Sequence, residues 1–183
     1  MTLIATDLAN LYPAHLASLQ QHYLDAAMLA GAAGVVIAAG ALQPCFLDDS
    51  HYPFVVNPHF KAWLPITEVP DSFLLIRAGK TPCLLLNQPE DYWHQTPADP
   101  QGFWVEHWQV QSIQSTAEVR RHLGDARDLL FIGEQTQLAT EWGFGAINTP
   151  AAMHLLHFER AYKSAYEIAC IYRANQTAVR GHR

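Results

Sequence analysis

Residues 72–87 read "SFLLIRAGKTPCLLLN", and this stretch decides the fold class. Two apolar runs, 72–78 and 82–87, flank Gly79-Lys80-Thr81, a spacing typical of a β-hairpin. The continuous apolar run "VVIA" at 35–38 is instead typical of a buried strand. Because strands and helical segments alternate along the chain, the sequence predicts an α/β domain. The hairpin makes its sheet a mixed β-sheet, with helices on both faces.

The helices follow from apolar periodicity and from capping residues. Leucines recur at helical spacing from Leu8 onward, and Pro13 fits the first position of a helix that runs to about Ala30. Thr149-Pro150 combines a cap with a proline at the first helical position. Further helices are expected at 115–123, 134–142, 149–158 and 160–179, and further strands at 45–47, 105–113, 128–133 and 146–148.

Composition narrows the class of protein. The chain has 183 residues, half of them hydrophobic, which suffices for one domain with a core. A net charge of −6 provides no basic face for nucleic acid. The apolar run 26–42 is shorter than the ~20 residues a membrane span needs, so no membrane contact is expected. Three well-separated cysteines, Cys45, Cys83 and Cys170, predict a reducing, cytoplasmic location.

Two groups of polar residues are candidates for chemistry. Asp48 and Asp49 are adjacent, so on an extended chain their carboxylates point to opposite sides and cannot easily share a metal ion. The alternative for them is a turn in which an Asp accepts backbone N–H bonds. His154 and His157 could share a helix face and bind a metal, or they could be surface or interface histidines. The residues alone therefore give an α/β domain without a complete catalytic set.

Several longer motifs carry a family resemblance. Residues 46–70, "FLDDSHYPFVVNPHFKAWLPITEVP", resemble the N-terminal domain of bacterial Xaa-Pro dipeptidases (prolidases) and of organophosphorus acid anhydrolases. These enzymes belong to the creatinase/aminopeptidase P/prolidase superfamily. The resemblance continues in "QPEDYWH" (88–94), "IGEQTQLATEWGF" (132–144) and "HFERAYKSAYEIACIYRANQTAVRGH" (157–182).

The resemblance implies a division of the protein into two parts. Residues 1–159 are expected to form the creatinase/prolidase-type N-terminal domain. Residues 160–183 are expected to form a linker helix into an absent C-terminal catalytic domain with the pita-bread fold. That domain is expected to hold two Mn²⁺ or similar divalent ions through two Asp, one His and two Glu, none of them in this chain. The 183 residues are therefore expected to contain no metal site, no cofactor and no catalytic residue, and to be inactive alone.

The resemblance also implies what this domain contributes. The expected partners are its own catalytic domain, a second subunit of a homodimer, and a dipeptide ending in proline. The loop after "FLDD" is expected to close the partner subunit's substrate pocket through Asp49, Tyr52, Pro53 and Phe54. Asp49 would hold the free amine of the dipeptide, and Asp48 would fix the turn. The alternative is a stand-alone α/β module for binding or dimerisation, without enzyme activity.

Overall fold

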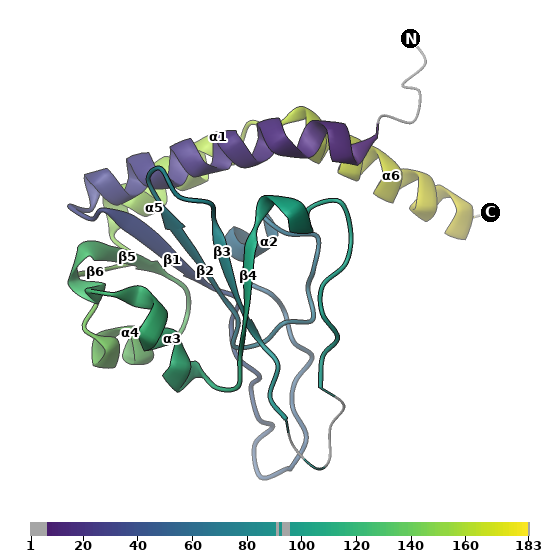
Figure 1. Cartoon of the computed structure of the whole chain (residues 1–183). Helices are drawn as coiled ribbons and strands as arrows, with labels where there is room; N and C mark the ends of the chain where they lie inside the picture. Colours follow the sequence, from purple (N-terminus) through teal and green to yellow (C-terminus); the bar gives the residue numbers. More distant parts are fainter. Residues whose placement is uncertain (1–6, 91, 93–95, 183) are drawn as a thin grey trace.

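The computed structural model describes residues 7–90, 92 and 96–182, and these form one six-stranded sheet between layers of helices (Figure 1). The strands are β1 (Gly34–Ala38), β2 (Phe73–Arg77), β3 (Cys83–Asn87), β4 (Gln109–Ile113), β5 (Leu129–Ile132) and β6 (Ala146–Ile147). The α-helices are α1 (Leu8–Leu29), α2 (Pro58–Lys61), α3 (Thr116–Leu123), α4 (Thr136–Trp142), α5 (Pro150–Glu159) and α6 (Ala165–Gly181). Short 3₁₀ helices, η1 (Val105–His107) and η2 (Ala126–Asp128), precede β4 and β5.

The sheet is mixed, as the hairpin predicts. Its strand order is β4-β3-β2-β1-β5-β6, and β2 runs antiparallel to both of its neighbours. Phe73 pairs with Leu85 in the hairpin, whereas the pairs β1–β5, β3–β4 and β5–β6 are parallel. Strands β1 and β3 therefore run in the same direction, and their carboxyl ends lie at the same end of the sheet. The segment that follows β1 projects beyond that end of the sheet (Figure 1).

Helices cover both faces of the sheet, which confirms the predicted layers. Side chains alternate along β1: Val35 and Ile37 belong to the apolar core beneath α1 and α5, whereas Val36 and Ala38 belong to the core shared with α3 and α4. All five residues of β1 are buried, as a central strand between two helical layers requires. The sheet is thus covered on both faces, and the segment after β1 extends from the end of the sheet at which β1 finishes.

The structure corrects the predicted start of the first helix. Helix α1 begins at Leu8, and Pro13 lies inside it. The Asp7 carboxylate accepts a hydrogen bond from the Ala9 N–H at 3.1 Å, so a polar cap sets the helix start before the proline is reached. The apolar run 26–42 is divided between the end of α1 and the strand β1. Among the described residues, no helix has both the length and the apolar character to cross a membrane.

Three other predicted elements need correction. The strand expected at 45–47 is wrong: only Pro44 and His51 form a bridge there, and 45–48 make a turn. The strand expected at 105–113 is a 3₁₀ turn followed by the shorter strand β4. The helix expected from Arg160 begins at Ala165, because Ser164 and Glu167 form a capping box that satisfies the first N–H groups of α6.

Candidate functional site

The motif 46–63 divides into two halves with opposite environments. Its second half is buried: Val56, Phe60 and Trp63 are each less than 10% exposed. Its first half belongs to a two-legged ribbon, residues 41–56, that projects from the carboxyl end of β1 (Figure 1). The ribbon is the candidate site, and the buried half is its foundation.

Asn57 joins the ribbon to the sheet. Its Nδ2 donates to the Ala38 carbonyl at 2.9 Å, and its backbone N–H donates to the Ala39 carbonyl at 2.8 Å. Its Oδ1 accepts from the His59 N–H at 2.9 Å and so caps helix α2, in which Pro58 takes the first position. One side chain therefore fixes the returning leg of the ribbon to β1 and starts the buried half of the motif.

Polar side chains of α1 hold the buried half in place. The Tyr12 hydroxyl donates to the Trp63 carbonyl at 2.7 Å and accepts from Trp108 Nε1 at 2.8 Å. The Tyr23 hydroxyl lies 2.8 Å from His59 Nδ1. Burial strongly raises the pKa of both tyrosines, so their hydroxyls remain protonated donors. These bonds satisfy polar groups that would otherwise be costly to bury.

The ribbon itself has regular cross-strand bonds. The Tyr52 N–H donates to the Gln43 carbonyl and the Cys45 N–H to the Ser50 carbonyl, each at 2.9 Å. At the base, Gly40 has a φ of +110°, which favours glycine, and a side chain there would lie 3.5 Å from the Phe54 ring. The Phe54 ring packs against the core at this point. The ribbon is thus ordered from base to tip by its own contacts.

Asp48 fixes the turn at the tip, as predicted. Its Oδ1 accepts from the Ser50 N–H at 2.8 Å, and its own N–H donates to the Cys45 carbonyl. The bonds from Ser50 lower the pKa of the Asp48 carboxyl, because they stabilise its charged form. Asp48 is therefore an ionised turn residue, which is the alternative to a metal ligand that the sequence left open.

The predicted substrate residues all lie on this ribbon, in different settings. Asp49 follows the turn and is exposed, and Tyr52 and Pro53 are exposed on the returning leg. Phe54 is half-buried at the base, so its contact is with the ribbon's foundation. Within this domain the four residues are brought to one projecting segment. The 88–94 motif that carried part of the resemblance includes residues 91, 93 and 94, which lie outside the described residues.

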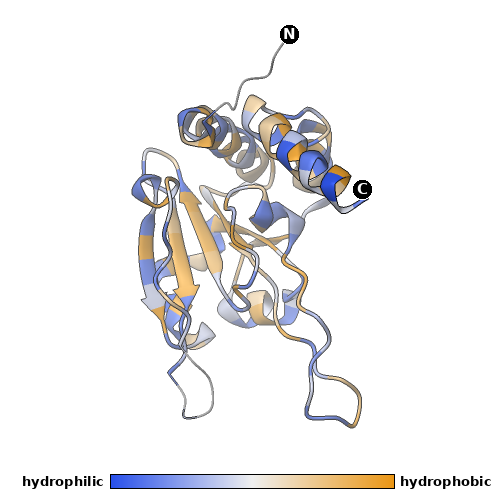
Figure 2. Cartoon of the chain, turned by 90° about the vertical axis from the view of Figure 1, so that its right-hand side faces the viewer, coloured by the Kyte–Doolittle hydropathy of each residue, from blue (hydrophilic) through white to orange (hydrophobic). Residues whose placement is uncertain are grey.

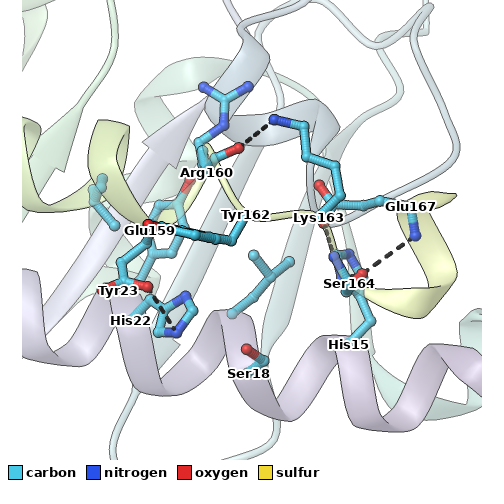
Figure 3. Close-up of a pocket in the computed structure, with 12 residues that line it drawn as sticks. His15, Ser18, His22, Tyr23, Glu159, Arg160, Tyr162, Lys163, Ser164 and Glu167 are labelled. Atoms are coloured by element: carbon cyan, nitrogen blue, oxygen red, sulfur yellow. Dashed lines mark hydrogen bonds and ion pairs between the residues drawn. The ribbon is translucent and has the colours of Figure 1, made fainter. Parts of the chain in front are cut away.

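A second polar cluster joins α1 to the start of α6 (Figure 3). His15 Nε2 donates to the Ala62 carbonyl at 2.9 Å, and its Nδ1 is hydrogen-bonded to the Ser164 hydroxyl, also at 2.9 Å. The adjoining cavity, of about 200 Å³, contains the His22–Glu159 pair at 3.5 Å. The sequence analysis did not identify His15. The Ser164-x-x-Glu167 spacing, however, is typical of a capping box at the start of a helix. These side chains pair with one another and orient α6.

The two histidines weighed as metal ligands do not form a site with each other. His157 stacks on the buried His59 ring, at a centroid distance of 5.4 Å, whereas His154 is exposed on α5. Burial, with smaller contributions from nearby Arg160 and His157, lowers the pKa of His59 to about 4. Over the described part of the chain, no group of three or more His, Cys, Asp or Glu could hold a metal ion. The described residues therefore do not fit a two-manganese centre.

Solved structures show the same fold class. Proline aminopeptidase P II from Yersinia pestis superimposes with a TM-score of 0.61 at 18% identity, over 95% of this chain and 44% of that one. Escherichia coli aminopeptidase P with the inhibitor Pro-Leu gives a TM-score of 0.56 at 16% identity, over 91% of this chain and 43% of that one. At these identities the likeness concerns the α/β fold alone.

The sequence comparisons define the family. A family model described as Xaa-Pro dipeptidase, N-terminal domain, matches residues 10–158, and the chain belongs to this family. An Xaa-Pro dipeptidase of Pseudoalteromonas atlantica is 39% identical over 176 residues, which are 96% of this chain and 40% of the relative. One of Colwellia psychrerythraea is 38% identical over 183 residues, or 100% of this chain and 41% of the relative. The chain thus spans about two fifths of the length of these relatives.

Proposed function

We propose that this chain is the non-catalytic N-terminal domain of a metal-dependent Xaa-Pro dipeptidase, which hydrolyses dipeptides ending in proline. Residues 1–159 are the domain itself, and 160–183 lead into a catalytic domain. In a homodimer, the ribbon of one subunit closes the substrate pocket of the other. The observation that carries this proposal is an ordered ribbon that projects from the sheet edge of a domain with this family membership (Figure 1).

The places of the ribbon residues support the roles proposed for them. Asp49 is an exposed carboxylate beside a fixed turn, so it can hold the free amine of a dipeptide by a charge-assisted hydrogen bond. Tyr52 and Pro53 stand on the returning leg, where they can exclude water from a closed pocket. Phe54 stiffens the base. A segment that is already ordered loses less conformational entropy when it docks.

The metal chemistry belongs to the part of the protein outside these residues. In the proposed enzyme, two Mn²⁺ or similar ions bound outside these residues would supply a Lewis acid for the peptide carbonyl and an activated water. This chain supplies the lid and orients the substrate, and its described residues offer no group of ligands for the metals. The three free cysteines agree with the proposed location in a reducing cytoplasm.

Two single substitutions in the full-length enzyme test the assignment. Asp49→Asn removes the charge that would hold the amine, and we expect kcat/KM for an Xaa-Pro dipeptide to fall about 100-fold, with less discrimination against tripeptides. Asp48→Asn is the matched control, because it removes the neighbouring charge while an amide oxygen can still accept from Ser50. We expect it to retain activity within about threefold, since the turn persists. Equal activity of both variants would remove the role assigned to Asp49.

The 183 residues alone provide the complementary test. We expect no hydrolysis of Xaa-Pro dipeptides by this chain with added Mn²⁺. Clear turnover would contradict the non-catalytic role. A full-length reading frame without a catalytic domain would favour the stand-alone binding or dimerisation module.

A further inference from the structure

The base of the ribbon has a second attachment to the sheet besides Asn57. At the carboxyl end of β1, the Gly40 carbonyl accepts a hydrogen bond from the Asp71 N–H at 2.8 Å, just before β2 begins. Asn57 holds the leg of the ribbon that returns to the sheet, whereas this bond holds the outgoing leg, which starts at residue 41. The ribbon extends away from α1 and α6 (Figure 2). The contacts at its base therefore set its direction.

Asp71 occupies an unfavourable conformation at this attachment. Its φ is +58°, in the left-handed region that is costly for a residue other than glycine. Its carboxylate is half-buried, and burial raises the pKa of this group. Backbone strain of this kind persists only where the surrounding structure holds it, and it is concentrated at functional sites.

Gln135 is the neighbour that holds Asp71. Its Nε2 donates to Asp71 Oδ1 at 3.1 Å, and this bond opposes the effect of burial on the pKa of the carboxyl. Gln135 directly precedes α4, yet its side chain makes no capping bond to that helix. The residue also lies in the 132–144 segment, which shares the family resemblance but has no part in the proposed function so far.

The segment that carries Gln135 is itself fixed by the end of β6. Asn148 Nδ2 donates to the Gly133 carbonyl at 2.8 Å, and Asn148 Oδ1 accepts from the Gly133 N–H at 3.0 Å. The Asn148 N–H donates to the Phe131 carbonyl at 2.9 Å. A row of hydrogen bonds, connected through residues 133–135, thus runs along the end of the sheet from β6 to the base of the ribbon.

We propose that Gln135 and Asp71 are positioning residues that fix the outgoing leg of the ribbon at Gly40 and so set the direction of Asp49. This inference rests on the proposed function for the role of Asp49 in binding the substrate. Both residues act through Gly40 rather than by contact with the substrate. Loss of the bond between them leaves the strand pairs and both apolar cores intact, so the chain should still fold while the ribbon loses its fixed direction.

Amide hydrogen exchange of the 183-residue chain tests the attachment. Gln135→Leu removes the donor to Asp71 at a similar side-chain size. Gln137→Leu is the matched control, because it removes an exposed bond to Glu141 within α4. We expect Gln135→Leu to speed exchange of the Asp71 and Tyr52 N–H groups at least about tenfold, with less than about a twofold change in β2. The control should change neither region by more than about twofold.

Steady-state kinetics of the full-length enzyme test the positioning role. In Gln135→Leu we expect KM for an Xaa-Pro dipeptide to rise about tenfold and kcat to change less than about threefold, because the ribbon contributes to binding. Asp71→Asn is the conservative variant, since its amide oxygen can accept from Gln135 and asparagine tolerates the left-handed backbone. We expect Asp71→Asn to keep KM within about twofold of the unaltered enzyme.

The outcomes separate this inference from the proposed function. Unchanged exchange of the Asp71 and Tyr52 N–H groups in Gln135→Leu, or an equal acceleration in β2, would overturn the attachment. Faster exchange with an unchanged KM, in an enzyme that Asp49→Asn impairs, would overturn the positioning role. Faster exchange together with an ineffective Asp49→Asn would remove the substrate role of Asp49 and still support the attachment of the ribbon.

Discussion

The two halves of the 46–63 motif are continuous in sequence, yet their surroundings are opposite. At one end, Phe46 and Leu47 stand almost fully in solvent at the tip of the ribbon. At the other end, Phe60 and Trp63 are completely enclosed between α1 and the sheet. The change from one environment to the other occurs within two residues, Val55 and Val56, which are 81% and 7% exposed.

This contrast places the contacts that stabilise the domain in the buried half and the residues of the proposed site in the exposed half. The buried half is held by hydrogen bonds that cross to α1 and β1, through Tyr12, Tyr23 and Asn57. Because these bonds fix the foundation, the tip can expose apolar surface without loosening the domain. Substitutions in the foundation should therefore change the free energy of unfolding, whereas substitutions at the tip should change activity.

The largest effect on stability is expected from Tyr12→Phe. The substitution removes the hydroxyl that bonds both the Trp63 carbonyl and Trp108 Nε1, and it leaves two buried polar groups unpaired. The free energy of unfolding should fall by about 3 kcal/mol, measured by urea denaturation. Tyr52→Phe is the control, because Tyr52 is 58% exposed and should change stability by less than about 0.5 kcal/mol. Equal losses of unfolding free energy in the two variants would contradict the conclusion that only the buried half stabilises the domain.

An effect of up to similar size is expected from pH, through His59. The folded chain protonates His59 only near pH 4, because of burial, whereas the unfolded chain does so near 6.5. Between these values the unfolded chain binds more protons, so the free energy of unfolding falls as pH drops from about 6.5 to about 4. The loss should reach up to roughly 3 kcal/mol. Urea titrations of His59→Asn over the same range should show a smaller slope, and parallel slopes would contradict this origin.

Sequence patterns predicted the parts of the molecule that depend on local apolar spacing. The hairpin at 72–87 and the buried run at 35–38 became β2, β3 and β1, because continuous apolar runs bounded by turn residues have few alternatives. The strand expected at 45–47 failed because turn bonds from Asp48 and the left-handed Leu47 outweigh the short apolar run. The start of α1 was missed because the proline was a stronger signal in the sequence than the Asp7 cap.

The sequence grouped the predicted site residues on one segment, but it did not show that their surroundings would differ. The resemblance identified Asp49, Tyr52, Pro53 and Phe54 as one group, whereas the fold exposes the first three and packs Phe54 at the base. No local pattern separates Phe54 from Phe46, since both are phenylalanines in one polar and aromatic segment. Phe54 is half-buried because it lies at the base of the ribbon beside Gly40, whereas Phe46 is exposed because it lies at the tip. These positions are a property of the tertiary structure.

The smallest effect, and the one of opposite sign, is expected from Leu47→Gly. Glycine adopts a φ of +57° without the steric cost that leucine bears there, and the lost side chain is 91% exposed. The free energy of unfolding of the 183-residue chain should therefore stay level or rise, by up to about 1 kcal/mol in urea denaturation. Val55→Gly is the control, since Val55 is similarly exposed but has a negative φ, and glycine there should destabilise the chain by roughly 0.5–1 kcal/mol. Destabilisation by Leu47→Gly equal to that of Val55→Gly would mean that the left-handed backbone at Leu47 carries no strain.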